Sequence, residues 1–139
     1  MSRTLYTYGY GAAGSKQELE KLIAAGATIL DVRLRASSRN PLWSKSNLQG
    51  RLGDLYVHEP ALGNLNYRNG GPIVIADLEK GLKTVESLFD RGPVVLLCAC
   101  AEGKTCHRMA VAKAVKRQWR DVRICHILSA IGLCILGMP

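Results

Sequence analysis

Short apolar runs alternate with longer amphipathic stretches along this chain. The short runs are rich in β-branched and aromatic residues, which favours strands. We expect strands over residues 4–10, 28–32, 55–58 and 122–128, and a buried central strand in the apolar run that begins at residue 94. The stretches between them place apolar residues three and four apart, the spacing of a helix with one buried face.

Recognisable start and stop signals flank the expected helices. Ser15 and Glu18 form a capping box, and Gly26 follows the last turn of that helix. Ser44 is placed to cap a short helix that carries spaced leucines. Pro72 suits the first turn of a longer helix that reaches residue 91, with the inward stripe Val74, Leu78, Leu82, Val85 and Phe89.

Strands that alternate with helices at this spacing are typical of one fold class. They predict an α/β layered sandwich whose mainly parallel β-sheet is flanked by helices, in a Rossmann-like manner. Because the chain has 139 residues and no linker or repeat, we expect a single domain over residues 1–139. Residues 129–139 form a short apolar tail that packs on the domain or across a homodimer interface.

The charge is strongly positive and unevenly distributed. Nineteen Lys and Arg residues oppose 11 Asp and Glu, for a formal net charge of +8. The basic residues gather over residues 33–51 and 104–123, and the second segment contains Asp121 as its only acid. Such clusters suit a phosphate-bearing small molecule or a nucleic acid. A solubilising surface charge is the alternative explanation.

The cysteines and the hydropathy indicate a compartment. No apolar run approaches the ~20 residues needed to span a bilayer, so we expect no membrane partner. The sequence shows no secretory leader. Its five cysteines show no regular disulfide spacing. We therefore expect a cytoplasmic protein whose thiols bind metal, act in catalysis or are buried, rather than form disulfides.

Three of the cysteines lie close together with a histidine. Cys98 and Cys100 point to one face of the expected strand, and Cys106 and His107 follow the polar turn. These four side chains match the ligand types of zinc, although adjacent helical residues diverge by ~100°. The alternative is a set of buried apolar thiols. We favour the alternative and predict no bound metal and no cofactor.

The same turn carries candidate catalytic groups. We expect Thr105 to cap the helix that starts at Cys106, where the positive helix end and nearby basic residues lower a thiol pKa. Cys106 is then a candidate nucleophile, and His107 a candidate proton donor or acceptor. Glu102 and Asp31 are candidate acid–base groups. The alternative for Glu102 is a solvated turn residue, and the alternative for Asp31 is a structural ion pair.

Phosphate would be held by basic residues and by the helix N-terminus. The candidates are Arg33, Arg39, Lys104, Thr105 and Arg108. In a parallel sheet the carboxyl ends of strands meet at one edge, so we expect Asp31, Arg33 and Arg108 to lie there together. Asp31 would then pair with Arg33 or with Arg108, because a buried carboxylate requires a partner.

These motifs resemble a family called domain of unknown function 488. The matching pieces, in chain order, are Thr7-Tyr8-Gly9, Asp31-Val32-Arg33, Ser38-Arg39, the spaced Leu48 and Leu52, His58 to Gly63, Leu96-Leu97-Cys98, Cys106-His107-Arg108 and His126-Ile127. The resemblance covers residues 4 to 128. It implies an α/β fold in which these motifs meet at one pocket.

Three hypotheses on function follow. The first is an enzyme-like domain that binds a phosphate-bearing substrate, a nucleotide or a nucleic acid, in the pocket of Cys, His, Arg and Asp residues. The second is a non-catalytic nucleic-acid-binding protein that uses the basic segments. The third is a small zinc-binding structural or regulatory domain. The sequence leaves open whether the protein is an enzyme.

Overall fold

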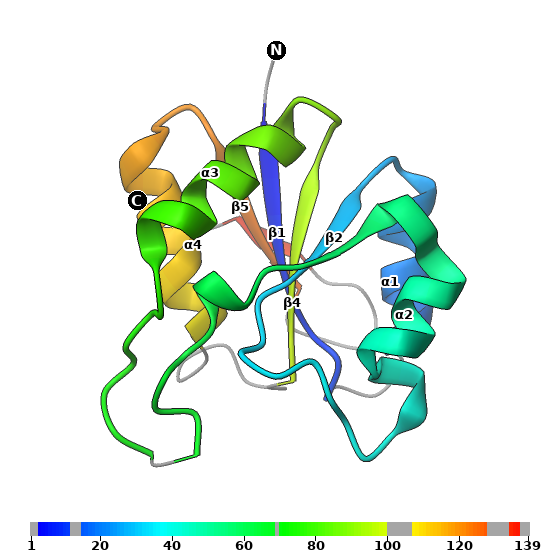
Figure 1. Ribbon diagram of the computed structural model, residues 1–139. Coiled ribbons are helices and arrows are strands. Elements are labelled where there is room, and N and C mark those ends of the chain that lie inside the picture. The colour runs from blue at the N-terminus through cyan, green and yellow to red at the C-terminus, as the bar shows by residue number, and fades with distance from the viewer. Residues whose placement is uncertain (1–2, 12–14, 69, 100–106, 128–133, 137–139) are drawn as a thin grey trace.

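A six-stranded sheet organises the part of the chain that the structure describes (Figure 1). The computed structural model describes residues 3–11, 15–68, 70–99, 107–127 and 134–136. The strands run in the order β3-β2-β4-β1-β5-β6. Their bounds are β1 Thr4–Gly9, β2 Thr28–Asp31, β3 Tyr56–His58, β4 Val94–Cys98, β5 Arg123–Ile127 and β6 Cys134–Leu136.

Within the described residues, four helices cover the two faces of this sheet. They are α1 Ser15–Ala24, α2 Lys45–Leu52, α3 Leu78–Phe89 and α4 His107–Gln118. Helices α3 and α4 lie on one face, and α1 and α2 on the other (Figure 1). Short 3₁₀ turns at Pro41–Trp43, Gly53–Leu55 and Pro60–Leu62 complete the connections in the described part of the chain.

The alternation of side chains along the strands creates a separate core on each face. Val94, Leu96 and Cys98 of β4 pack toward α3 and α4, whereas Val95 and Leu97 pack toward α1 and α2. All five are buried. A strand covered on both faces has to be apolar at every position, which is why β4 reads as a continuous apolar run. The expected α/β sandwich with a mainly parallel sheet is confirmed.

The strand order determines which groups meet. Strands β1 to β5 are all parallel, and β6 is antiparallel to β5. The order β3-β2-β4-β1-β5 differs from the 3-2-1-4-5-6 order of the dinucleotide-binding fold. The carboxyl ends of β1 to β5 form one edge of the sheet, called here the carboxyl edge. Residues 134–136 of the apolar tail pack on the domain as β6.

The expected start of the third helix is wrong. The prediction placed it at Pro72, but α3 begins at Leu78, where the Asp77 side chain accepts a hydrogen bond from the Lys80 N–H. The preceding residues are not helical: the Leu65 N–H donates to the Val74 carbonyl, and Asn64 forms a bridge with Ile75. Val74 is consequently 45% exposed instead of lying on the inward stripe.

The second helix also begins differently in detail. It starts at Lys45 with Ser44 in the capping position, as expected, but the Ser44 hydroxyl makes no capping bond. It donates instead to the Pro41 carbonyl. No helix in the described part of the chain is long and apolar enough to cross a membrane.

Candidate functional site

Asp31 lies at the end of β2 and is fully buried on the face covered by α1 and α2. Its Oδ1 accepts hydrogen bonds from the Arg33 backbone N–H, at 3.1 Å, and from Arg33 Nε, at 2.8 Å. Its Oδ2 accepts from Arg33 Nη2, at 2.6 Å, and from the Tyr56 hydroxyl. The carboxylate is therefore saturated with donors, and a bidentate Asp31–Arg33 ion pair forms.

The guanidinium of Arg33 is held as firmly as the carboxylate. Its Nη1 donates to the Tyr10 hydroxyl, at 3.2 Å, and to the Ser37 carbonyl, at 3.3 Å. Four of its five N–H groups are thus used within the chain. Burial opposes the charge of Arg33, but the hydrogen bonds and charge of Asp31 outweigh it and raise the pKa of Arg33.

The remaining neighbours complete a rigid cluster at this position. Tyr10 stacks on Trp43, with ring centroids 4.9 Å apart and an interplanar angle of 11°. Burial, followed by the hydrogen bond to Asp31, raises the pKa of Tyr56, so its hydroxyl stays protonated and donates. The cluster ties β2 to β3 and to the segment before α2, and little of Arg33 remains to bind a ligand.

His107 and Arg108 begin α4 at the same edge of the sheet. The His107 Nε2–H donates to the Val32 carbonyl, at 2.7 Å. Burial lowers the pKa of His107, so the ring is neutral at pH 7. Arg108 is fully buried and its Nη1 donates to Cys98 Sγ, at 3.5 Å.

The carboxyl edge therefore collects the described candidate residues, but on two faces. Asp31 and Arg33 lie toward α1 and α2, whereas Cys98 and Arg108 lie on the side of α4. Of the two ion pairs considered from the sequence, the structure forms Asp31–Arg33. Arg39, which was expected to bind phosphate, is exposed. The candidates Glu102, Lys104, Thr105 and Cys106 lie outside the described residues.

The cysteines differ from expectation. Cys98 and Cys125 are both disulfide-bonded, whereas the sequence favoured free thiols. Within the described residues, no three His, Cys, Asp or Glu side chains are grouped as metal ligands. Two of the four sequence-predicted zinc ligands, Cys100 and Cys106, lie outside those residues.

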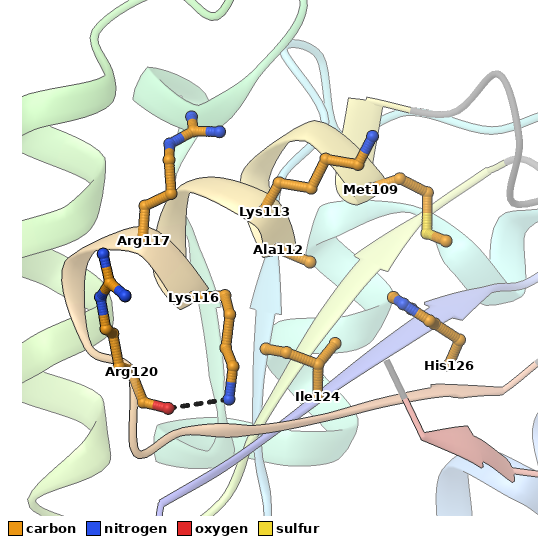
Figure 2. A pocket seen from close by; sticks show the side chains of 8 residues that line it. All are labelled: Met109, Ala112, Lys113, Lys116, Arg117, Arg120, Ile124 and His126. Carbon is orange, nitrogen blue, oxygen red and sulfur yellow. Dashed lines mark hydrogen bonds between the residues drawn. The ribbon is translucent and has the colours of Figure 1, made fainter. Parts of the chain in front are cut away.

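A second region has the form of a binding pocket. It lies between α4 and β5, on the face opposite Asp31, and has a volume of about 580 Å³ (Figure 2). Ala112 and Ile124 are buried beneath it, and Met109 is half-buried beside them. The other described residues that line it are basic or histidine: Lys113, Lys116, Arg117, Arg120 and His126. An apolar floor with a cationic rim suits an anion that also carries an apolar part.

The four rim cations have different roles. Lys116 Nζ donates to the Arg120 carbonyl, at 2.8 Å, and to the Val122 carbonyl, at 2.6 Å, so it ties the end of α4 to the turn before β5. Lys113 and Arg117 are exposed one helical turn apart on α4, and Arg120 is exposed in the turn after the helix. Figure 2 shows their charged ends well separated rather than directed at one point.

His126 forms the wall of the pocket on β5. Its ring points into the space between Met109, Ala112 and Ile124 (Figure 2). Its Nδ1 lies 2.7 Å from the hydroxyl of Thr7, a fully buried residue of β1. Burial, and then the charge of Arg108, lowers the pKa of His126.

Sequence reasoning found part of this pocket. The basic residues of α4 are readable as the exposed side of an amphipathic helix, and His126 shares a strand face with Ile124. The contact of His126 with Thr7 was missed, because it requires β1 and β5 to be neighbours. The register that pairs these two residues is a property of the sheet and not of either segment.

We compared the chain with protein-family models, with curated proteins and with solved structures, and found no match in any of the three.

Proposed function

We propose that this domain binds a phosphate-bearing partner, and specifically a nucleic acid strand, in the pocket between α4 and β5. The observation that carries the proposal is the row of exposed cations Lys113, Arg117 and Arg120 above an apolar floor. The chain's net charge of +8 supports it, because a positive surface attracts polyanions over long distances.

The spacing of these cations favours a strand over a single phosphate. With a rise of 1.5 Å per residue, Lys113 and Arg117 are ~6 Å apart along α4, and Arg120 lies in the turn that follows the helix. Their charged ends diverge (Figure 2), so one phosphate cannot contact all three. Successive phosphates of an extended strand can, and the apolar floor of Ala112 and Ile124 offers a surface for a base or ribose.

The salt dependence of binding tests this proposal. Fluorescence anisotropy with a labelled single-stranded oligonucleotide would be measured over a series of KCl concentrations. Each phosphate contact to a single strand contributes a slope of about −0.7 in log K against log salt. Replacing Lys113, Arg117 and Arg120 together by alanine should therefore flatten the slope by about 2.

A matched control removes the same charge elsewhere. Lys16→Ala, Lys21→Ala and Lys45→Ala together also delete three positive charges, but on exposed positions of α1 and α2 on the opposite face. This variant should keep most of the wild-type affinity and slope. Equal losses in the two triple variants would show a non-specific charge effect and reject the pocket as the site.

A second candidate is an enzyme-like site for a small phosphate-bearing substrate at the carboxyl edge, the first hypothesis drawn from the sequence. The observation that favours it is a neutral histidine, His107, at the start of α4 beside the carboxyl end of β2. Titration with a nucleotide should then shift the His107 imidazole NMR signals. The triple variant in the α4 pocket should leave that shift unchanged, and a His107 signal that never moves rejects this candidate.

A further inference from the structure

One neutral form of the His126 ring satisfies both contacts of the Thr7 hydroxyl. Thr7 Oγ1 contacts both His126 Nδ1, at 2.7 Å, and Met109 Sδ, at 3.9 Å. Both contacts are hydrogen bonds when the hydroxyl proton points at the sulfur, which only accepts, and the hydroxyl oxygen accepts from Nδ1–H. In that tautomer the lone pair of the neutral ring lies on Nε2.

The free nitrogen belongs to a side chain that lines the pocket. Nε2 of His126 has no hydrogen-bond partner within the described residues, and the ring points into the space over Ala112 and Ile124 (Figure 2). Burial and the positive charge of Arg108 keep the ring unprotonated at neutral pH. A base therefore stands beside a row of cations, with its orientation fixed by a buried threonine.

We propose that His126 is a general base that cleaves single-stranded RNA bound in this pocket. The inference rests on the proposed function, because the cations of α4 would hold the phosphates. Only RNA carries a 2′-hydroxyl next to each phosphate, and the bases of a single strand are free to be splayed out and stacked on a protein surface.

The reaction is an internal transesterification. His126 Nε2 takes the proton of the 2′-hydroxyl, and the 2′-oxygen forms a bond to the adjacent phosphorus. The bond from phosphorus to the 5′-oxygen breaks, and that oxygen takes a proton from water, while the imidazolium returns its proton to solvent. The products are a 2′,3′-cyclic phosphate and a 5′-hydroxyl. A rim cation such as Lys113 would stabilise the negative charge that grows on the phosphoryl oxygens.

A DNA strand with one internal ribonucleotide tests the chemistry directly. The wild-type protein should cut it at the ribonucleotide alone, leaving a 2′,3′-cyclic phosphate that mass spectrometry identifies, and should leave the all-DNA strand intact. His126→Asn keeps an amide near the Nδ1 position for Thr7 and lacks the Nε2 position. It should still bind the strand, because Lys113, Arg117 and Arg120 are unchanged, and should cleave bound strand at least about 100-fold more slowly at saturating protein.

The control is His58→Gln, purified in the same way. His58 lies on β3, at the opposite side of the sheet, where its Nε2–H donates to the Arg33 carbonyl. This variant should cleave at the wild-type rate. Wild-type protein that binds RNA without cutting it, or His126→Asn that cuts normally, overturns this inference and leaves the proposed function standing. Absence of binding to any strand overturns both. Should His126→Asn not fold, the position of the wild-type cut and its cyclic end still decide the question.

Discussion

The strongest stability prediction concerns the buried ion pair between Asp31 and Arg33. Asp31→Asn keeps the size of the side chain but removes the charge that faces Arg33, which is only 6% exposed. The guanidinium would keep the Tyr10 hydroxyl and the Ser37 carbonyl as acceptors and lose its counter-ion. Breaking one side of a buried pair costs about 3–5 kcal/mol, because an uncompensated charge remains.

The expected shift in melting temperature follows from the chain length. An unfolding entropy of about 2.1 cal/mol/K per residue gives roughly 0.29 kcal/mol/K for 139 residues. A loss of 3–5 kcal/mol should therefore lower the Tm by roughly 10–17 °C. Thermal unfolding by circular dichroism would measure this shift, and urea unfolding would give the free energy independently.

A double-mutant cycle separates the pair from its surroundings. Arg33→Met should also destabilise the protein, because it leaves a buried carboxylate with the Tyr56 hydroxyl and one backbone N–H as donors. The double variant Asp31→Asn/Arg33→Met leaves no unpaired buried charge at this position. Its loss of unfolding free energy should therefore be smaller than the sum of the two single losses by at least about 1 kcal/mol. Additive losses, or an Asp31→Asn loss below about 1 kcal/mol, would refute the assignment of this pair as a coupled structural unit.

Two further predictions concern packing and pH. Gly81→Ala should cost about 1–3 kcal/mol in urea unfolding, because the new Cβ would lie 2.2 Å from Cδ2 of the fully buried Leu62. Gly50→Ala in α2 meets no atom within 4 Å and should instead stabilise by about 0.5–1 kcal/mol, so a loss there would contradict the packing argument. Folding lowers the pKa of His107 below its ordinary 6.5, so the unfolded state binds more protons and stability should fall as the pH drops below that value. His107→Gln, whose amide can replace the bond to the Val32 carbonyl, should weaken this fall in urea titrations at several pH values; an unchanged pH dependence would show that His107 does not contribute to it.

The sequence was most informative where burial alone decides local structure. β4 is covered by helices on both faces, so its five buried residues are all apolar and mark a strand directly. The start of α3 was not readable in the same way. Pro72 satisfies the local preference of a first helical turn, but the hydrogen bond between Leu65 and Val74 holds the following residues outside a helix. That pairing depends on a tertiary contact that local preference does not reveal.

The candidate sites were also predictable only in part. The ends of β2 and β4 predicted that Asp31 and Cys98 would lie at one edge of the sheet, and parallel pairing places them there. Which face each side chain occupies, and whether Asp31 pairs with Arg33 or Arg108, depends on the helices packed above. The pocket beside α4 was readable only as a basic helix face. Its floor and its histidine come from β5, whose position beside β1 follows from the strand order.

The two outermost strands of the sheet are its shortest. β3 and β6 contain three residues each, whereas the interior strands contain four to six. Unpaired backbone groups at a sheet edge are a template on which another chain can add a strand, and long flat edges are the usual starting point of β-aggregation. In the described part of this chain, the longer strands lie inside the sheet, where each is hydrogen-bonded to a strand on both sides. Concentrated solutions should therefore resist edge-to-edge aggregation, even though the central strands are as apolar as those of many aggregation-prone peptides.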